Sequence, residues 1–146
     1  MTVDHSVSIA APRAVVWTIL TDVERWPEWT ASMRSVQYVG ADQLTLGGQV
    51  RIKQPGMPAL VWKVTALVPQ ESFAWMATSG GVTTVGLHQL TLSPSGGVTV
   101  RLGLEQRGPL AGLVGLLTAS RTRRYVQMEA DGLKRRSEEA APAAHG

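Results

Sequence analysis

The chain has 146 residues, of which 44% are hydrophobic and 17% are charged, and its formal net charge is +3 at pH 7. This length allows one domain with a single good core. No apolar run approaches the ~20 residues that cross a bilayer, so we expect no membrane insertion. The absence of cysteine excludes disulfides and thiolate metal sites. Together with the lack of a signal-peptide pattern, it predicts a cytoplasmic protein.

The N-terminal part predicts one strand followed by two short helices. Residues 3–9 alternate between apolar and polar side chains, as in a half-buried strand. Pro12 is well placed to begin a helix over residues 12–22. Pro27 interrupts the next segment, 22–33. Because the residue before a proline avoids helical dihedral angles, two short helices fit better than one.

The middle of the chain predicts six short strands separated by turns. They span residues 34–40, 47–54, 59–69, 72–79, 82–92 and 98–106, with turn clusters such as PGMP at 55–58 and SPSGG at 93–97. Alternation within each strand assigns one set of side chains to the inner face. That set includes Leu60, Trp62, Val64, Ala66, Val68, Phe73, Trp75, Ala77, Val82, Thr84, His88, Leu90, Leu92, Val98, Val100, Leu102, Leu104 and Gln106.

Residues 108–139 form the only long helical pattern in the sequence. At about 100° per residue, one face carries apolar side chains and then two arginines: Leu110, Leu113, Leu117, Arg121, Arg124 and Met128. A helix that directs arginines along its apolar stripe indicates one that lines a cavity. We expect residues 140–146 to form a disordered tail, which leaves a single domain over residues 1–139.

The order of elements is one strand, two helices, six strands and a long helix, with no internal repeat or linker. Strands in a row that are segregated from a terminal helix indicate an antiparallel α+β fold. A strongly curved sheet of this kind can wrap the helix and leave a hollow between the two.

A known superfamily shares this order and these motifs. The chain resembles the START-like helix-grip (SRPBCC) superfamily and its polyketide cyclase/dehydrase branch in the segments IAAPRAVVWTILTDVERWPEW (9–29), RIKQPGMPALVWKVTAL (51–67), SFAWMATSGGVTTVGLHQL (72–90) and LEQRGPLAGLVG (104–115). The resemblance implies a seven-stranded antiparallel sheet that grips the last helix around an apolar cavity. Members include lipid carriers, hormone receptors, aromatase/cyclases and oxygenase domains, and their catalytic residues are not shared between branches. The resemblance therefore assigns no residue role.

Three residues are candidates for chemistry in such a cavity. His88 is expected on the inner face, where a neutral imidazole can accept or donate a proton. The alternative is a core histidine that is hydrogen-bonded to a backbone carbonyl or a water. Arg121 and Arg124 can bind a ligand carboxylate, phenolate or enolate through their planar forks of donors. The alternative is that both extend to solvent with their stems packed on the sheet edge.

Tryptophans are the second signal, since large flat side chains suit broad apolar pockets. Trp26 and Trp29 are expected to act as a movable lid, with residues 24–33 and the loop 55–58 forming the mouth. Core filling is the alternative, and we expect it for at least two of the four tryptophans Trp26, Trp29, Trp62 and Trp75. The full set expected to contact ligand is Trp26, Trp29, Met33, Leu60, Trp62, Phe73, Trp75, Thr84, His88, Gln106, Leu113, Leu117, Arg121, Arg124, Tyr125 and Met128.

Other classes of site are disfavoured. His5, His88 and His145 are far apart in the sequence and no paired carboxylate spacing is present, so we expect no metal. No glycine-rich loop opens a helix and no nucleophile motif occurs, so we expect no cofactor. Nucleic-acid binding needs exposed aromatic side chains among the basic ones, and only Tyr125 is near them.

Two functions remain. The leading hypothesis is a monomeric or homodimeric binding protein that encloses a small hydrophobic ligand, which is polycyclic, polyketide-like or a lipid. The alternative is a cofactor-independent cyclase/dehydratase, in which His88 is the general acid/base and Arg121 or Arg124 stabilises the developing oxyanion.

Overall fold

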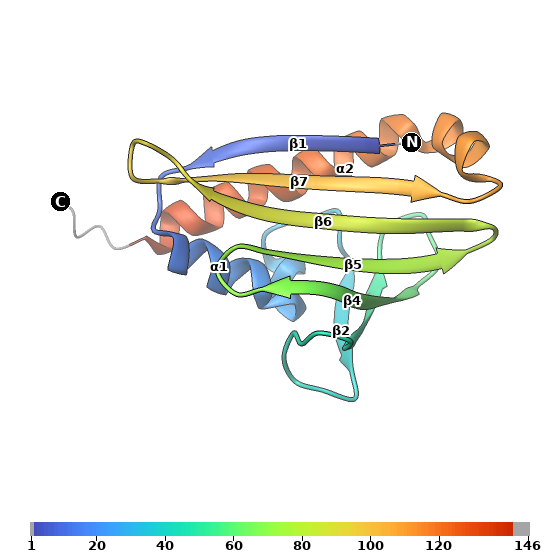
Figure 1. The fold of residues 1–146 in the computed structure, drawn as a ribbon, viewed down its shortest axis with the longest axis horizontal. Helices are drawn as coiled ribbons and strands as arrows, with labels where there is room; N and C mark the ends of the chain where they lie inside the picture. Colours follow the sequence, from blue (N-terminus) through green and yellow to red (C-terminus); the bar gives the residue numbers. More distant parts are fainter. Residues whose placement is uncertain (1, 142–146) are drawn as a thin grey trace.

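The chain folds into one strongly curved sheet that holds a long helix against its concave face (Figure 1). The structure is a computed structural model, and it describes residues 2–141. In chain order the elements are β1 (Thr2–Ile9), α1 (Arg13–Thr21), the 3-10 helix η1 (Val23–Glu28), β2 (Ser35–Val39), β3 (Gln49–Lys53), β4 (Leu60–Val68), β5 (Ser72–Ser79), β6 (Val82–Leu92), β7 (Val98–Arg107) and α2 (Ala111–Ala140).

The sheet has seven strands in the order β1-β7-β6-β5-β4-β3-β2, and every neighbouring pair is antiparallel. The first strand therefore pairs with the last one, and α1 and η1 carry the chain from one edge of the sheet to the other. This architecture confirms the α+β helix-grip prediction, including the two short helices. Helix α2 ends one residue later than predicted, and Ala141 caps it. Residues 142–146 of the predicted tail lie outside the described residues.

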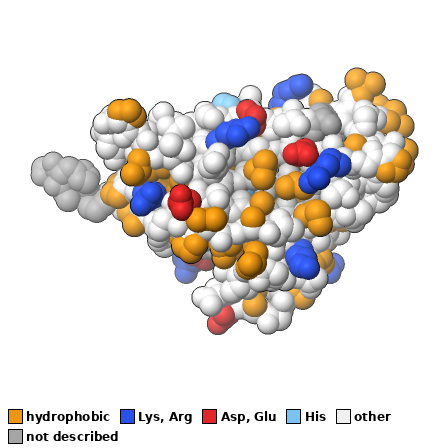
Figure 2. Space-filling view, viewed as in Figure 1, with side chains coloured by type: hydrophobic (Ala, Val, Ile, Leu, Met, Phe, Trp, Pro, Cys, Tyr) orange, Lys and Arg blue, Asp and Glu red, His pale blue; other side chains and the backbone are white. Residues whose placement is uncertain are grey.

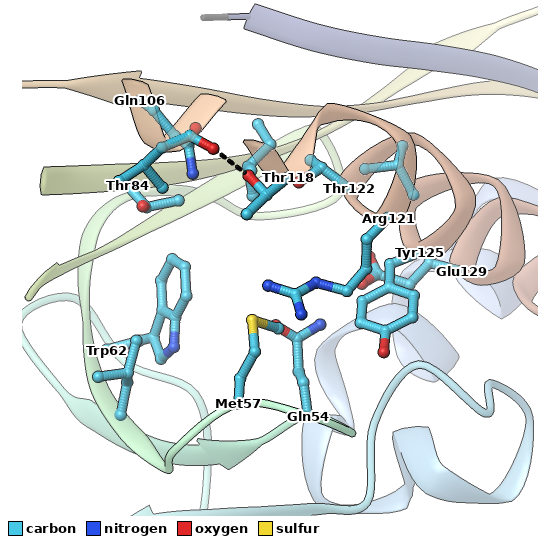
Figure 3. Close-up of a pocket in the computed structure, with 14 residues that line it drawn as sticks. Gln54, Met57, Trp62, Thr84, Gln106, Thr118, Arg121, Thr122, Tyr125 and Glu129 are labelled. Carbon is cyan, nitrogen blue, oxygen red and sulfur yellow. Dashed lines mark hydrogen bonds between the residues drawn. The ribbon is translucent and has the colours of Figure 1, made fainter. Parts of the chain in front are cut away.

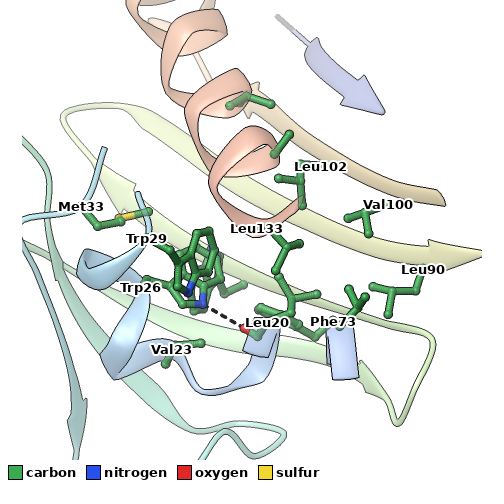
Figure 4. Close-up of a cluster of buried hydrophobic side chains, with 14 of the residues drawn as sticks. Leu20, Val23, Trp26, Trp29, Met33, Phe73, Leu90, Val100, Leu102 and Leu133 are labelled. Carbon is green, nitrogen blue, oxygen red and sulfur yellow. Dashed lines mark hydrogen bonds between the residues drawn. The ribbon is translucent and has the colours of Figure 1, made fainter. Parts of the chain in front are cut away.

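The C-terminal half of α2 is packed into the core. Ala130 and Leu133 are fully buried and Val126 is 6% exposed. Gly132 is required here, because a Cβ at this position would collide with the carbonyl oxygen of Trp29. Figure 4 shows Leu133 between Trp29 and the strand residue Leu102. This end of the helix is therefore fixed against both the sheet and the residue that follows η1, Trp29.

Two strand ends depart from the predicted inner face. A bulge between Val64 and Ala66 shifts the register of β4 against β5, and beyond it the alternation is displaced. Ala66 is exposed and Val68 is 45% exposed, whereas the intervening Leu67 packs against the core. Assigning Ala66 and Val68 to the inside was therefore wrong. Leu92, the last residue of β6, is also exposed, because it lies at the hairpin end of the strand.

Within residues 2–141, no helix has both the length and the apolar character that would be needed to span a membrane.

Candidate functional site

A cavity of about 150 Å³ lies between α2, the loop before β4, and strands β4, β6 and β7 (Figure 3). It is lined by Gln54, Met57, Leu60, Trp62, Thr84, Leu104, Gln106, Val114, Thr118, Arg121, Thr122, Tyr125, Val126 and Glu129. Its volume compares with that of an apolar protein cavity of ~150 Å³ that admits benzene. The cavity therefore holds about one ring, and a larger molecule must extend through its mouth.

A second, inner space of about 40 Å³ continues the cavity toward the core. Both spaces are lined by Gln54, Trp62, Leu104, Val126 and Glu129, and the inner one adds Trp26, Met33, Ile52, Trp75, His88 and Leu102 among others. An ordered water occupies ~30 Å³ in the liquid, so the inner space has room for about one. Glu129 and Trp62 thus stand where the two spaces meet, and we call the pair of spaces the hollow.

One face of α2 forms the helical wall of the hollow. Val114, Thr118, Arg121, Tyr125 and Glu129 follow one another at spacings of three or four residues, which places them on the same face. Most of these side chains are polar, so a search for apolar periodicity does not find this face. The prediction missed five residues that line the hollow, although their helical spacing from Arg121 and Tyr125 could have identified them: Val114, Thr118, Thr122, Val126 and Glu129.

The predicted leucine stripe of α2 lies on a different face. Leu110, Leu113 and Leu117 are 47%, 59% and 75% exposed and do not line the hollow, so the prediction that they point inward was wrong. The physical reason is that Val114, Thr118 and Arg121 turn toward the hollow, which places the leucines on the solvent side of this half of the helix. Met128 also does not line the hollow.

The two candidate arginines, Arg121 and Arg124, point in different directions. Arg124 is exposed, and its guanidinium carbon lies 5.8 Å from the centre of the Tyr125 ring, which matches the solvent-directed alternative. Arg121 is partly buried and directs its guanidinium into the hollow toward Trp62, beside the ends of the Met57 and Gln54 side chains (Figure 3). Among residues 2–141, the ion pairs and hydrogen bonds do not include Arg121. Its fork of donors is therefore available to an oxygen in the hollow.

Glu129 is the titratable side chain of the hollow that the sequence analysis missed. Burial raises the pKa of its carboxyl from 4.5 to about 8, against a smaller opposing effect of hydrogen bonding to the Ser32 side chain. The carboxyl is therefore mostly protonated at neutral pH, and in that form it can donate a hydrogen bond or a proton.

His88 lies deeper, in an aromatic cluster. Its ring stacks on Phe73 with centroids 4.0 Å apart and meets the edges of Trp26 and Trp75. Its Nδ1 is 3.2 Å from the backbone oxygen of Phe73. Burial lowers the pKa of His88 to about 4, so the imidazole is neutral at pH 7. This arrangement matches the core-histidine alternative, although His88 does border the inner space.

Trp26 and Trp29 do not form a lid, and that prediction was wrong. They are 1% and 4% exposed, their ring centroids are 5.3 Å apart, and Trp26 Nε1 donates to the backbone oxygen of Leu20 at 2.9 Å. Trp26 lines the inner space of the hollow, whereas Trp29 packs beside it in the core. The loop 55–58 does border the hollow through Met57, and it is tied to α2 where the Tyr125 hydroxyl donates to the Pro55 oxygen at 2.9 Å.

The structure thus brings part of the predicted set together. Of the predicted residues, the outer space is lined by Leu60, Trp62, Thr84, Gln106, Arg121 and Tyr125. The inner space is also lined by Trp26, Met33, Trp75 and His88. Phe73 lies in the core, and Trp29, Leu113, Leu117, Arg124 and Met128 do not line the hollow. The described residues hold no group of three or more ligating side chains that could bind a metal ion.

The sequence matches the family described as "Polyketide cyclase / dehydrase and lipid transport" over residues 1–138. The chain belongs to this family. The match spans every strand and nearly all of α2, and it agrees with the resemblance found in the sequence. No curated protein matches the chain.

Solved structures of similar shape support the fold assignment. A protein from Helicobacter pylori has a TM-score of 0.82 at 15% identity, covering 94% of this chain and 88% of its own. An aromatase/cyclase from a Streptomyces species has a TM-score of 0.79 at 18% identity, covering 100% of this chain and 98% of its own. A protein from Thermus thermophilus has a TM-score of 0.76 at 18% identity, covering 96% of this chain and 99% of its own. At these identities the likeness concerns the fold alone.

Proposed function

We propose that this member of the family binds a small ligand that has an apolar ring and an oxygen-bearing polar end. The observation that carries the proposal is Arg121, a partly buried guanidinium with no protein partner among the described residues, directed into a largely apolar cavity. A ligand ring packs between Trp62, Leu104 and Val126, and its carboxylate, phenolate or enolate oxygen meets the guanidinium.

Glu129 makes this preference depend on pH. Below about pH 8 its carboxyl is protonated and does not repel an anionic ligand. As the pH rises through about 8 the carboxylate forms beside the anion site, so binding of an anion weakens. A lipid or a polyketide-like chain also fits the proposal, provided that the part of it beyond one ring extends out of the cavity.

The test is a titration of the purified protein with benzoate, which has one ring and one carboxylate, followed by Trp fluorescence and calorimetry. Exchanging Arg121→Gln is expected to weaken benzoate at least ~10-fold, which is about 1.4 kcal/mol. Arg124→Gln is the matched control, since Arg124 is on the same helix but does not line the hollow. Equal losses in both variants, or no saturable binding of benzoate or of 2-naphthoate, would contradict the proposal.

A second function is favoured by Glu129 and Arg121 lining one cavity. In a dehydration of the cyclase/dehydratase kind, the carboxylate form of Glu129 takes the proton from the carbon next to the substrate carbonyl, and Arg121 stabilises the enolate oxygen that forms. The protonated Glu129 then gives this proton to the hydroxyl that leaves from the next carbon, so that water is lost and a double bond forms. Glu129 is a better proposal for this proton transfer than His88, whose pKa of about 4 makes it a weak base and whose Nδ1 faces a backbone carbonyl.

Turnover separates the two functions. An aryl β-hydroxy ketone dehydrates to a conjugated enone, which absorbs in the near ultraviolet. If the protein is an enzyme, it accelerates this dehydration. Glu129→Gln then lowers the rate by about 10²–10⁴-fold, whereas benzoate binding persists. A binding protein gives saturable binding and no acceleration. A rate that depends on His88 and not on Glu129 would overturn the assignment of the proton to Glu129.

A further inference from the structure

The first half of α2 exposes an unusual group of leucines. Leu110, Leu113, Leu116 and Leu117 are 47%, 59%, 80% and 75% exposed, and we call them the leucine face. They lie on the first turns of the helix, on the side that does not line the hollow. Figure 2 shows hydrophobic side chains gathered at the end of the molecule where Figure 1 places the start of α2. Contiguous exposed apolar surface of this kind marks an interaction site.

The charge near the leucine face is mainly positive. Residues 107–128 contain four arginines and no aspartate or glutamate; Arg107 pairs with Glu105, whereas Arg121, Arg123 and Arg124 form no ion pair within residues 2–141. Arg123 and Arg124 are exposed and follow Leu117 by six and seven residues, which is about 9–10 Å along a helix axis. A bilayer's polar layer is about 5–8 Å deep on each side of its apolar interior. When the helix approaches with its N-terminal end toward the bilayer, arginines at this offset therefore reach the headgroups while the leucines reach the acyl boundary.

We propose that the first half of α2 docks this protein on the surface of a bilayer that contains anionic lipids. The leucine face enters the boundary between headgroups and acyl chains, and Arg123 and Arg124 bind the lipid phosphates. The docking is peripheral and differs from the membrane insertion that the sequence analysis excluded.

Charge favours a bilayer over a second copy of this chain as the occupant. In a two-fold pair built on the leucine face, the arginines of both copies would be desolvated against a helical stretch that has no carboxylate. An anionic membrane supplies the missing negative charge. Docking would also bring Arg121, which borders both the leucine face and the hollow, close to the lipid surface. If the proposed function holds, an apolar ligand could then enter the hollow without crossing bulk water.

The experiment is sedimentation of the full chain with vesicles of phosphatidylcholine, with and without phosphatidylglycerol. The wild type is expected to bind the anionic vesicles, more weakly as salt increases, and not the neutral ones. Leu113→Gln/Leu116→Gln/Leu117→Gln and Arg123→Gln/Arg124→Gln should each weaken binding at least ~10-fold; all five side chains are exposed, and glutamine keeps a high helix propensity.

Leu46→Gln/Leu92→Gln is the matched control, because these leucines are 66% and 59% exposed and belong to the loop before β3 and to the last position of β6, not to the leucine face. It should bind like the wild type. The proposal is overturned if the wild-type protein does not bind anionic vesicles, or if the control variant loses as much vesicle binding as the leucine and arginine variants. If the leucine variant instead converts a dimer to a monomer in analytical ultracentrifugation while vesicles are ignored, the occupant is a second copy. Benzoate binding, measured without vesicles, tests the hollow separately, so failure of one proposal is distinguishable from failure of the other.

Discussion

The two halves of α2 belong to the same helix and have opposite surroundings. In the C-terminal half, Ala130, Leu133 and Ser137 are fully buried, and the helix packs on the sheet and on α1. In the N-terminal half the leucines are turned to solvent, and threonines and Arg121 face the hollow. The comparison shows that apolar periodicity identifies the inner face of a helix only where the helix is packed. Where the helix lines a cavity, the side chains that point inward can be polar, because they face a ligand site and not a packed core.

The sharpest test of this contrast compares two glycines of α2. Gly132→Ala should destabilise the fold by about 3 kcal/mol or more, because the new methyl group collides with the Trp29 backbone. Gly112→Ala has nothing within 4 Å of its new Cβ and should stabilise by about 0.5–1 kcal/mol through helix propensity. Urea unfolding of both variants measures the difference. The same sign in both would refute the distinction between a packed and an open half.

Leucine truncations give the next largest effect. Leu133→Ala removes a fully buried side chain and should cost about 2–5 kcal/mol. Leu117→Ala removes one that is 75% exposed and should change stability by no more than about 0.5 kcal/mol. A large loss at Leu117, measured by thermal or urea unfolding, would mean that this face is covered in the free protein.

The core should respond to acid through His88. The unfolded chain takes up this proton near pH 6.5, whereas in the folded protein the pKa is about 4. The contribution of neutral His88 to the free energy of unfolding is therefore fully present above pH 6.5. It falls by about 3 kcal/mol as the pH decreases to 4. His88→Phe should lack this part of the acid loss, and His5→Gln, in a partly exposed position, should retain it. Identical pH profiles for all three proteins would contradict the account.

The hollow should respond in the opposite direction through Glu129. Its folded pKa of about 8 lies above the unfolded value of 4.5, so its contribution is complete below pH 4.5 and is lost as the pH rises to 8. Because the side chain is partly exposed, we expect a loss of about 1–3 kcal/mol. Glu129→Gln should remove that loss, so that it is stabilised relative to the wild type at pH 8 and not at pH 4.5. Glu139→Gln, at an exposed position of the same helix, should leave the profile unchanged.

The sequence predicted the strands, the two short helices and the long helix, because alternation and proline- and glycine-rich turns are local signals. Alternation also placed Trp62, Thr84 and Gln106 in the hollow correctly. It failed after Val64, where a bulge that depends on pairing with β5 displaces the faces.

Two other features depend on tertiary structure and were not accessible from local patterns. Trp26 is held in the core by its hydrogen bond to the Leu20 oxygen and by the aromatic rings around it. The carboxyl of Glu129 acquires its raised pKa from burial by segments distant in sequence. A glutamate on a helix that ends in many charged residues looks like an ordinary surface side chain until the fold is known.

The central claim is that the hollow beneath the N-terminal half of α2 receives a ring with an oxygen held at Arg121. The most direct measurement is a ¹H–¹⁵N NMR titration of the wild type and of Arg121→Gln with benzoate at neutral pH. We predict saturable shift changes at the Trp62 indole and at the amides of Thr118 and Thr122, largely lost in the variant. Shifts confined to the exposed Arg123 and Arg124, or equal shifts in both proteins, would contradict the claim.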